Sequence, residues 1–216
     1  MTHYLFQHAD FWQLVTRLGE MSILLPAALL AMLTLLHRPA SRGLAFWWIL
    51  LLLASTTITT ASKIAFIGWG IGHAKANFTG FSGHAMFAAA IYPLLLGTLA
   101  SHLPLTGQRL AVACGFGIAL LVGMSRVWVG AHSWSEVIAG LLLGGTVSVC
   151  AMALSLLPRA VIGPLIPALV AAWLLIMPIH APPLGTHGLV TWLSLKLSGH
   201  QTPYTREDLL GGQRRS

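Results

Sequence analysis

The sequence predicts an all-α membrane protein, a polytopic bundle of about six transmembrane helices. Of its 216 residues, 56% are hydrophobic and only 8% are charged, whereas soluble domains carry about 25% charged residues. The mean hydropathy is +0.79. With 12 Lys+Arg and 5 Asp+Glu, the chain has too few charges to cover a soluble globule. An apolar composition also excludes a disordered chain, because disorder accompanies low hydrophobicity.

A transmembrane helix needs roughly 20 apolar residues, and the chain contains several runs near that length. The predicted spans are residues 21–36, 43–62 with an extension to 69, 83–102, 110–126, 137–157 and 160–177, the last ending at Pro178. Residues 1–20 lack the features of a cleavable signal peptide and are expected to form an interfacial helix or an unstructured terminus. A second interfacial helix is expected over 186–197, followed by a polar, mobile tail over 201–216. We therefore expect one domain over 1–216, with its core at 43–158 and flanks at 1–20 and 178–216.

The basic residues carry information about orientation. The net charge is +7, but these residues are scattered singly between apolar runs, so no nucleic-acid partner is expected. With six spans, one side of the membrane carries four arginines and no acidic residue, and the positive-inside rule places that side in the cytoplasm. These arginines are Arg38, Arg42, Arg109 and Arg159. Loops 64–82 and 127–136 then face outward, which in a bacterium is the periplasmic side of the inner membrane.

Ionisable residues within membrane bundles tend to be functional, and here they form three groups along the chain. Lys63 ends the second predicted span, and Ser82-Gly83-His84 opens the third. Ser125, Arg126, His132 and Glu136 lie between the fourth and fifth. Because consecutive spans alternate in direction, all three groups are expected at the same membrane face. Trp69, Trp128 and Trp134 in or beside the same loops favour a site at headgroup depth.

The chemistry of these groups suits a phosphorylated ligand. Lys63 and Arg126 are cations, and a helix N-terminus after Gly83 offers backbone N–H groups to an anion. If a helix begins near His132, Glu136 lies one turn later on the same face. Its carboxylate then accepts the imidazole Nδ1–H and leaves Nε2 as a nucleophile. His84, on another helix, is available to donate a proton to a leaving oxygen.

The set Lys63, Ser82-Gly83-His84 and Ser125-Arg126-x5-His132-x3-Glu136 resembles the type 2 phosphatidic acid phosphatase (PAP2) superfamily over roughly residues 60–145. The resemblance implies that His132 forms a phosphohistidine, His84 protonates the leaving group and Glu136 orients His132. It implies that Lys63, Arg126, Ser82 and the Gly83 amide bind the phosphoryl oxygens, with no metal or other cofactor. The expected substrate is an amphiphilic phosphate in the bilayer. The implied candidates are phosphatidic acid, phosphatidylglycerol phosphate, isoprenyl phosphates or diphosphates, and phosphorylated lipid A.

The sequence departs from the family pattern at three positions. The family's first motif is Lys, six residues, then Arg-Pro, but Gly70-Ile71 stands at that spacing after Lys63. Phe81 stands where Pro is usual, and Glu136 where Asp is commoner. Losing one charged hydrogen bond costs about 1.5–3 kcal/mol, which corresponds to roughly a tenfold to hundredfold loss of rate. As a hypothesis, Lys75 or His73 in the same loop replaces the missing arginine as a phosphate ligand.

Four alternatives remain open at this stage. Gly80-Phe81-Ser82-Gly83 fits the Gly-x-Ser-Gly pattern of rhomboid-like intramembrane proteases, with Ser82 as nucleophile and His132 as base. His84, His132 and Glu136 are chemically adequate ligands for zinc. The missing Arg-Pro pair would suit a non-catalytic lipid-phosphate binder or carrier on the same fold. Finally, an alcohol can replace water as the acceptor, which would make the protein a phosphotransferase.

Overall fold

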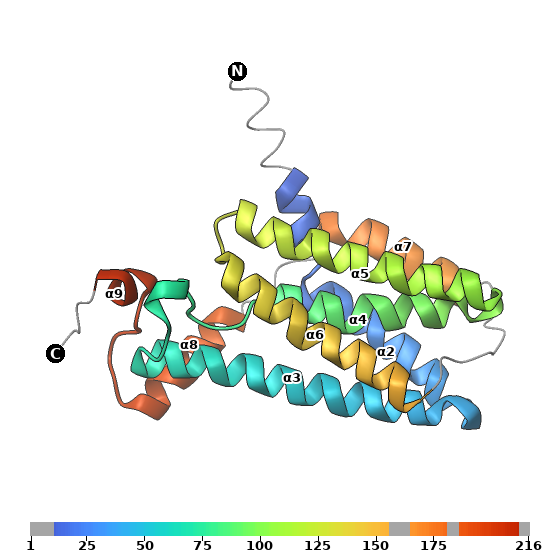
Figure 1. Ribbon diagram of the computed structural model, residues 1–216, viewed down its shortest axis with the longest axis horizontal. Coiled ribbons are helices and arrows are strands. Elements are labelled where there is room, and N and C mark those ends of the chain that lie inside the picture. Colours follow the sequence, from blue (N-terminus) through green and yellow to red (C-terminus); the bar gives the residue numbers. More distant parts are fainter. Residues whose placement is uncertain (1–10, 156–164, 181–185, 212–216) are drawn as a thin grey trace, which may run out of the picture.

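The computed structural model describes residues 11–155, 165–180 and 186–211. Within those ranges the chain is helical, without a β-strand, which confirms the all-α fold class (Figure 1). A short helix, Phe11–Arg17, precedes the labelled ones. The labelled helices are α2 (Met21–Leu36), α3 (Arg42–Trp69), α4 (Gly83–Leu99), α5 (Leu105–Trp128), α6 (Trp134–Leu154), α7 (Leu165–His180), α8 (Thr186–Ser198) and α9 (Arg206–Gly211).

Four helical stretches among the described residues are long and apolar enough to cross a membrane. They are Pro39–Trp69, Gly83–His102, Leu105–Trp128 and Trp134–Leu154. The bent pair Phe11–Arg17 and Met21–Leu36 makes a fifth if it is one span. The protein is therefore an integral membrane protein, but the expected count of six spans is not confirmed. The sixth predicted run begins at residue 160, outside the described residues, and α7 has 16 residues.

Two sequence-based boundaries were wrong. Pro178 lies inside α7, which ends at His180. A proline removes one backbone hydrogen bond from a helix, and the His180 Nδ1 lies 3.0 Å from the Ile176 carbonyl oxygen at this end. The tail expected to be mobile is folded over residues 201–211, where α9 forms. Residues 212–216 lie outside the described residues.

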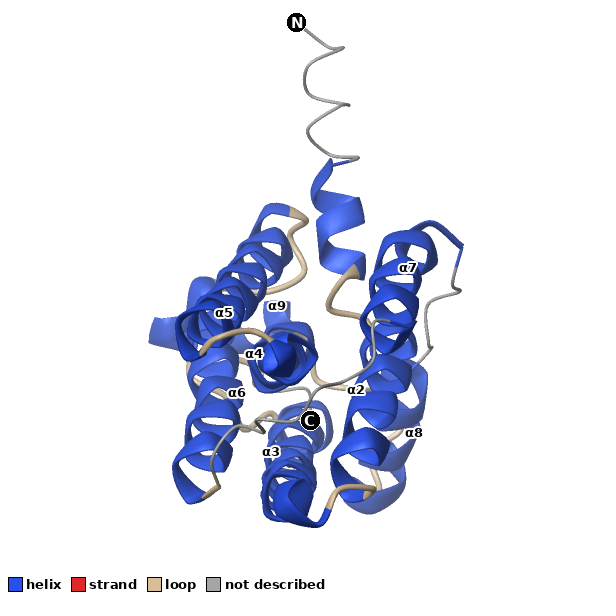
Figure 2. Ribbon diagram, turned by 90° about the vertical axis from the view of Figure 1, so that its right-hand side faces the viewer, coloured by secondary structure: helices blue, strands red, loops and turns tan. Residues whose placement is uncertain are grey.

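Helix α4 occupies the centre of the bundle (Figure 2), and 83% of its span is buried. Its neighbours approach closely because they present glycine to it. A Cβ atom on Gly140 of α6 would lie 2.6 Å from the Ser82 carbonyl oxygen, and one on Gly115 of α5 would lie 2.6 Å from the Pro93 backbone. Small residues at helix contacts allow this packing, which brings α6 against the N-terminal end of α4 and α5 against its interior around Pro93.

Polar side chains fix α4 against its neighbours where Pro93 interrupts its hydrogen bonding. Pro93 has no N–H to donate to the Ala89 carbonyl, and Ser148 Oγ of α6 donates to that oxygen instead at 2.7 Å. Trp48 Nε1 of α3 donates to the adjacent Ala90 carbonyl at 2.9 Å. These bonds satisfy groups that would be costly to leave unpaired inside a membrane, and they hold α3, α4 and α6 in a defined relative position.

Candidate active site

The helix directions bring the predicted polar groups to one end of the bundle, where α3 and α5 end and α4 and α6 begin (Figure 1). Lys63 lies in the last two turns of α3, and Ser82 is the N-cap residue of α4. Arg126 lies in the last turn of α5, and Glu136 in the first turn of α6. The expectation that the groups share one membrane face agrees with this arrangement.

The His132 imidazole and the Glu136 carboxylate form the central pair of the site. His132 Nδ1 lies 2.7 Å from Glu136 Oε2, and because a carboxylate only accepts hydrogen bonds, Nδ1 is the donor. The reason for this contact differs from the one expected. Helix α6 begins at Trp134, so His132 precedes the N-cap residue Ser133. The pair therefore meets around a helix start and not across one turn of a helix.

Ser133 and Glu136 form a capping box at this helix start. The Ser133 hydroxyl accepts from the Glu136 N–H, and Glu136 Oε2 accepts from the Ser133 N–H at 3.1 Å. Such a box satisfies two backbone donors that a helix leaves unpaired at its N-terminus. The Ser-x-x-Glu pattern was visible in the sequence and would have predicted this start. Glu136 thus has a local structural role in addition to its bond with His132.

Glu136 is fully buried, and hydrogen bonds compensate its charge from several directions. Its side chain has 0% relative exposure. Oε1 accepts from the Thr79 N–H at 2.7 Å and from the Thr79 hydroxyl at 2.5 Å. Arg206 Nη2 donates to Oε1 at 2.9 Å and to Oε2 at 2.8 Å. A buried carboxylate is stable when paired and hydrogen-bonded in this way.

His132 is held beside Arg126, and its environment keeps the imidazole neutral. Its backbone N–H donates to the Arg126 carbonyl at 3.1 Å. Burial is the largest influence and lowers the pKa of His132, and the nearby Lys63 and Arg126 charges lower it further. The hydrogen bond and the charge of Glu136 act in the opposite direction, but the net pKa shift is downward. A neutral imidazole with Nδ1–H directed at Glu136 has its lone pair on Nε2.

Two cations and a helix N-terminus surround the pair. Lys63, Arg126 and His132 all interact electrostatically with His84, the second residue of α4. A Cβ atom on Gly83 would lie 3.6 Å from Lys63 Nζ, which places the ammonium group at the start of α4. The first N–H groups of a helix have no partner within the helix and attract anions. These groups make the site strongly electropositive.

Two buried donors in this region have no hydrogen-bond partner among the described residues. They are Ser82 Oγ and Arg126 Nε. Arg126 is otherwise anchored, since its Nη1 donates to Thr16 Oγ1 at 2.8 Å. Buried polar groups are normally paired, so open donors beside Lys63 and the α4 N-terminus suit an oxyanion with several acceptor oxygens. The arrangement combines an anion site with two imidazoles, those of His132 and His84.

The structure places the remaining sequence candidates outside this cluster. Lys75 is exposed on the short 3-10 turn Ala74–Ala76, and no contact in the described part of the chain joins it to the other candidates. His73 is also exposed, and its Nδ1 accepts from the Ala76 N–H at 3.2 Å. The hypothesis that one of them replaces the missing arginine stays a prediction.

Sequence reasoning missed three side chains that contact the site: Thr16, Thr79 and Arg206. Thr16 belongs to the helix Phe11–Arg17, whose interfacial position was one of two expectations for residues 1–20. Arg206 lies in the segment expected to be mobile. In the sequence, Arg206 could not be distinguished from a solvent-exposed arginine in a polar tail. Its contact with Glu136 joins residues that are 70 positions apart. No local sequence pattern predicts a contact between residues so far apart.

The geometry also bears on two of the alternatives. A rhomboid-like site would need a hydrogen bond between Ser82 and His132, but within the described ranges Ser82 Oγ has no partner and His132 bonds to Glu136. For zinc, no three His, Cys, Asp or Glu side chains in the described segments lie in a group suited to a metal ion. Neither alternative gains support from these contacts.

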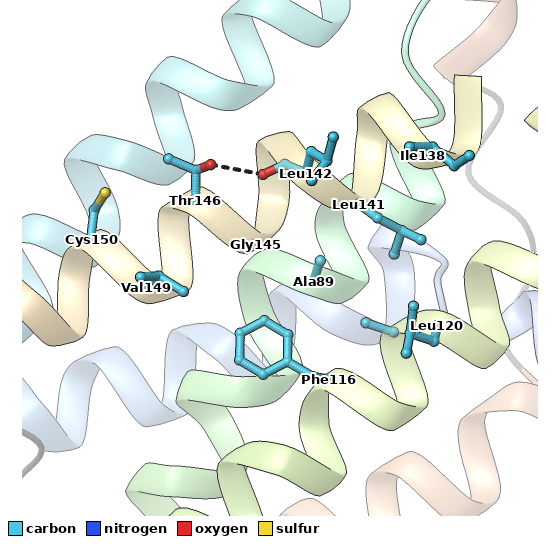
Figure 3. Close-up of a pocket in the computed structure, with 11 residues that line it drawn as sticks. Ala89, Phe116, Leu120, Ile138, Leu141, Leu142, Gly145, Thr146, Val149 and Cys150 are labelled. Atoms are coloured by element: carbon cyan, nitrogen blue, oxygen red, sulfur yellow. Dashed lines mark hydrogen bonds between the residues drawn. The ribbon is translucent and has the colours of Figure 1, made fainter. Parts of the chain in front are cut away.

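An apolar pocket of about 610 Å³ lies between α4, α5 and α6 (Figure 3), and it is open to the outside of the bundle, because Leu120, Ile138 and Leu142 in its lining are exposed. Its lining carries no charged side chain, and the hydroxyl of Thr146 donates to the Leu142 carbonyl at 2.8 Å. Ile138, half a turn after Glu136 on α6, lines one part of it. The pocket therefore suits hydrocarbon and not phosphate.

Comparison with known proteins agrees with this geometry. Residues 59–159, which include Lys63, His84, Arg126, His132 and Glu136, match the model of the PAP2 superfamily. The resemblance to the PAP2 superfamily is therefore confirmed over these residues. A crystal structure of a transmembrane PAP2 type phosphatidylglycerolphosphate phosphatase from Bacillus subtilis has the same fold. It superposes with a TM-score of 0.54 at 24% identity and covers 68% of this chain and 76% of that chain.

Three relatives match parts of this chain. An uncharacterized 22.5 kDa protein of the cps region of Klebsiella pneumoniae is 44% identical over 62% of this chain and 64% of its own length. Phosphatidylglycerophosphatase B of Bacillus subtilis is 38% identical over 32% of this chain and 36% of its own length. Lipid A 1-phosphatase of Rhizobium etli is 42% identical over 32% of this chain and 30% of its own length. The chain thus spans less than two thirds of each of these relatives.

Proposed function

We propose that this chain is an integral membrane phosphatase that hydrolyses a lipid phosphate monoester or diphosphate through a phosphohistidine intermediate, without a metal ion. The observation that carries the proposal is the hydrogen bond of 2.7 Å between His132 Nδ1 and the buried carboxylate of Glu136. A protein that only binds a phosphate needs cations, but it does not need a neutral imidazole fixed in one tautomer. The match of residues 59–159 to the PAP2 superfamily supports the same conclusion.

In the proposed first step, the Nε2 lone pair of His132 forms a bond to phosphorus while the bond from phosphorus to the leaving oxygen breaks. His84 donates its proton to that oxygen. Lys63, Arg126, Ser82 and the N–H groups at the start of α4 bind the phosphoryl oxygens and stabilise the charge in the transition state. Glu136 stabilises the imidazolium character that His132 gains.

In the second step, water attacks the phosphohistidine. The new bond joins the water oxygen to phosphorus, the bond from phosphorus to Nε2 breaks, and the water proton returns to His84. Inorganic phosphate leaves, and both imidazoles regain their starting protonation. The two histidines, the substrate and water therefore account for every proton transferred and for every bond formed or broken.

An amphiphilic substrate fits the position of the site. Trp69, Trp128 and Trp134 are exposed by 45%, 64% and 53% at the ends of α3, α5 and α6, and tryptophan favours the membrane interface. The apolar pocket between α4, α5 and α6 provides space for a hydrocarbon chain. The named relatives point to phosphatidylglycerol phosphate and phosphorylated lipid A as candidates, alongside phosphatidic acid and isoprenyl phosphates.

We also propose that the site faces the periplasm in a bacterial inner membrane. Arg38, Arg42 and Arg109 lie at the opposite end of the bundle, and basic residues favour the cytoplasmic side. Arg159 lies outside the described residues. In a variant lacking Cys114 and Cys150, Ala131→Cys should react with a membrane-impermeant maleimide in spheroplasts. Labelling only after cell lysis would contradict this orientation.

Phosphate release by the detergent-purified protein tests the function directly. A panel of lipid phosphates would be assayed with wild type, His132→Ala and His102→Ala, each with and without EDTA and orthovanadate. His102 ends the 3-10 turn Ala100–His102, which follows α4 at the opposite end of the bundle, and it is exposed, so it is a matched control. We expect vanadate-sensitive, EDTA-resistant release that falls by about 10⁴-fold or more in His132→Ala, as for removal of a nucleophile, and is unchanged in His102→Ala.

Other outcomes would reject parts of the proposal. Loss of release in EDTA, restored by a divalent cation, would reject metal independence. Full activity in His132→Ala would reject the phosphohistidine. Tight binding of a lipid phosphate without turnover by the wild type would favour the binder, and transfer to an added alcohol in place of water would favour the phosphotransferase.

A further inference from the structure

The C-terminal segment, defined here as residues 199–211, folds onto the site end of the bundle (Figure 1). Two hydrogen bonds attach its first part to the end of α3. His200 Nδ1 lies 2.7 Å from the Gly68 carbonyl oxygen, and the Tyr204 N–H donates to the Ile67 carbonyl at 3.0 Å. The segment is therefore a fixed part of the fold beside the candidate site.

Gly70 makes room for this segment. It ends α3 in the left-handed region, with φ at 69°, and a Cβ atom there would lie 2.9 Å from Cδ1 of the Tyr204 ring. Any larger residue would be strained and would displace the ring. Gly70 is also the position at which the sequence pattern led us to expect an arginine. The Tyr204 ring of the C-terminal segment thus occupies the space beside residue 70 that an arginine side chain would need.

The segment brings its own arginine to the site. Thr205 caps the start of α9, because its hydroxyl accepts from the Asp208 N–H at 3.3 Å, and its own N–H donates to Asp208 Oδ2 at 2.8 Å. This fixes the next residue, Arg206, whose side chain is 33% exposed. Its Nη2 bonds to both Glu136 oxygens, and its Nη1 donates to Asn77 Oδ1 at 2.6 Å.

We propose that Arg206 is a positioning residue of the active site: it holds the Glu136 carboxylate ionised and directed at His132. Arg206 belongs to the C-terminal segment, and this segment can dock only because residue 70 is glycine. This inference rests on the proposed function and extends it. Arg206 acts through Glu136, because Glu136 Oε2 accepts from both Arg206 Nη2 and His132 Nδ1. Partners behind a primary residue typically change activity by about 10–100-fold.

The charges around His132 define the expected signature. Its imidazole interacts with Glu136 of α6, Lys63 of α3, Arg126 of α5 and His84 of α4. Arg206 partly neutralises Glu136, the one negative charge in this set. Without Arg206 the carboxylate attracts a proton on His132 more strongly, so the pKa of His132 rises. If Arg206 only stabilised the fold, its substitution would not change the pKa of His132.

The test compares Arg206→Gln, Arg206→Lys and the control Lys196→Gln in the full chain. Lys196 is an exposed cation on α8 that lies over the Trp192 ring. For Arg206→Gln we expect kcat to fall about 10–100-fold, with KM within about twofold, and the acid limb of the pH profile to move to higher pH. Arg206→Lys should restore part of kcat because it keeps the charge without the bidentate geometry. Lys196→Gln should behave as wild type.

A second measurement does not depend on turnover. The ¹⁵N chemical shifts of the His132 ring, assigned by comparison with His132→Gln, report its tautomer and protonation against pH. We expect Arg206→Gln to raise the pH at which His132 protonates and to weaken its preference for Nδ1–H. If the wild type hydrolyses no lipid phosphate while this shift is observed, the proposed function fails and the positioning role stands.

Two results would overturn the inference. A large rise in KM with kcat unchanged in Arg206→Gln would make Arg206 a phosphate ligand. Unchanged kinetics together with unchanged His132 shifts would make it a structural surface residue. Gly70→Ala supplies an independent check, because it displaces Tyr204 but keeps Arg206. It should lower kcat in the same direction, and wild-type kinetics in Gly70→Ala would reject the role of the docked segment.

Discussion

The α5–α6 connection and the C-terminal segment contact the same carboxylate, but they reach it in different ways. His132 and Ser133 lie within four residues of Glu136 and meet it around one helix start. Arg206 lies 70 residues away in sequence and meets it only because residues 199–204 dock on the end of α3. The buried carboxylate of Glu136 therefore has two kinds of partner: residues close to it in sequence, and Arg206, which only tertiary packing brings near.

The two regions also differ in what secures them. The capping box at Ser133 is maintained by the helix itself, because it satisfies backbone donors that α6 would otherwise leave unpaired. The C-terminal segment depends on a few contacts at Gly68, Gly70 and Asn77. We therefore expect the C-terminal segment to be more sensitive to substitution of the residues that hold it in place. We expect substitutions in the α5–α6 connection to have the larger effect on catalysis.

The largest effect after loss of His132 itself is expected for Glu136→Gln. The amide keeps the shape of the side chain but loses the charge that both regions bind, so the tautomer of His132 is no longer enforced. We expect kcat to fall by about 10³–10⁴-fold, as for loss of the carboxylate in other histidine systems. Glu207→Gln, an exposed carboxylate on α9, is the control for phosphate release. A loss smaller than that of Arg206→Gln would contradict the shared role.

A smaller loss is expected for Arg126→Lys, which tests the anion side of the local region. Lysine keeps the charge but cannot reproduce the planar fork or hold Thr16 in the same geometry. We expect kcat/KM to decrease about tenfold to a hundredfold, because one or two charged hydrogen bonds are lost. Arg109→Lys, exposed at the opposite end of the bundle, should leave kcat/KM unchanged. Equal effects of the two variants would indicate a general loss of folding.

The pH dependence sharpens the comparison further. In the proposed mechanism His132 acts in its neutral form, and its pKa is lowered from the ordinary 6.5 by burial and by Lys63 and Arg126. Neutral His132 therefore persists below pH 6.5, and the acid limb of kcat/KM should lie below that value. The measurement is a pH profile of kcat/KM for wild type. A midpoint of the acid limb above pH 6.5 would show that another group controls it.

The smallest effect is expected for Lys75→Ala. Lys75 is exposed on the loop that Arg206 contacts through Asn77, and screened surface charges contribute little. We expect kcat and KM within about twofold of wild type, since a single solvated charge is worth less than about 1 kcal/mol. A tenfold rise in KM would instead support the hypothesis that Lys75 replaces the missing arginine, and would weaken the case for Arg206.

Much of the fold was predictable because apolar run length is a direct consequence of the membrane environment. The starts or ends of α3, α4 and α6 lie within a few residues of the predicted positions. The short helices were harder. Helix α9 has six residues and no apolar pattern, and α7 continues past Pro178, which a sequence rule takes as an end. Those outcomes depend on neighbours and not on local composition.

The sequence by itself determined the membrane class, the shared end of the bundle for Lys63, His84 and Arg126, and the pairing of His132 with Glu136. Alternating spans bring the first three residues to one end, and a separation of four residues keeps His132 close to Glu136, although the contact forms around the start of α6. Only the tertiary structure decided that Gly70 admits Tyr204 and that Arg206 reaches Glu136. The reason is physical: a contact across 70 residues depends on the shape of two surfaces, and no periodicity or spacing along the chain records that shape.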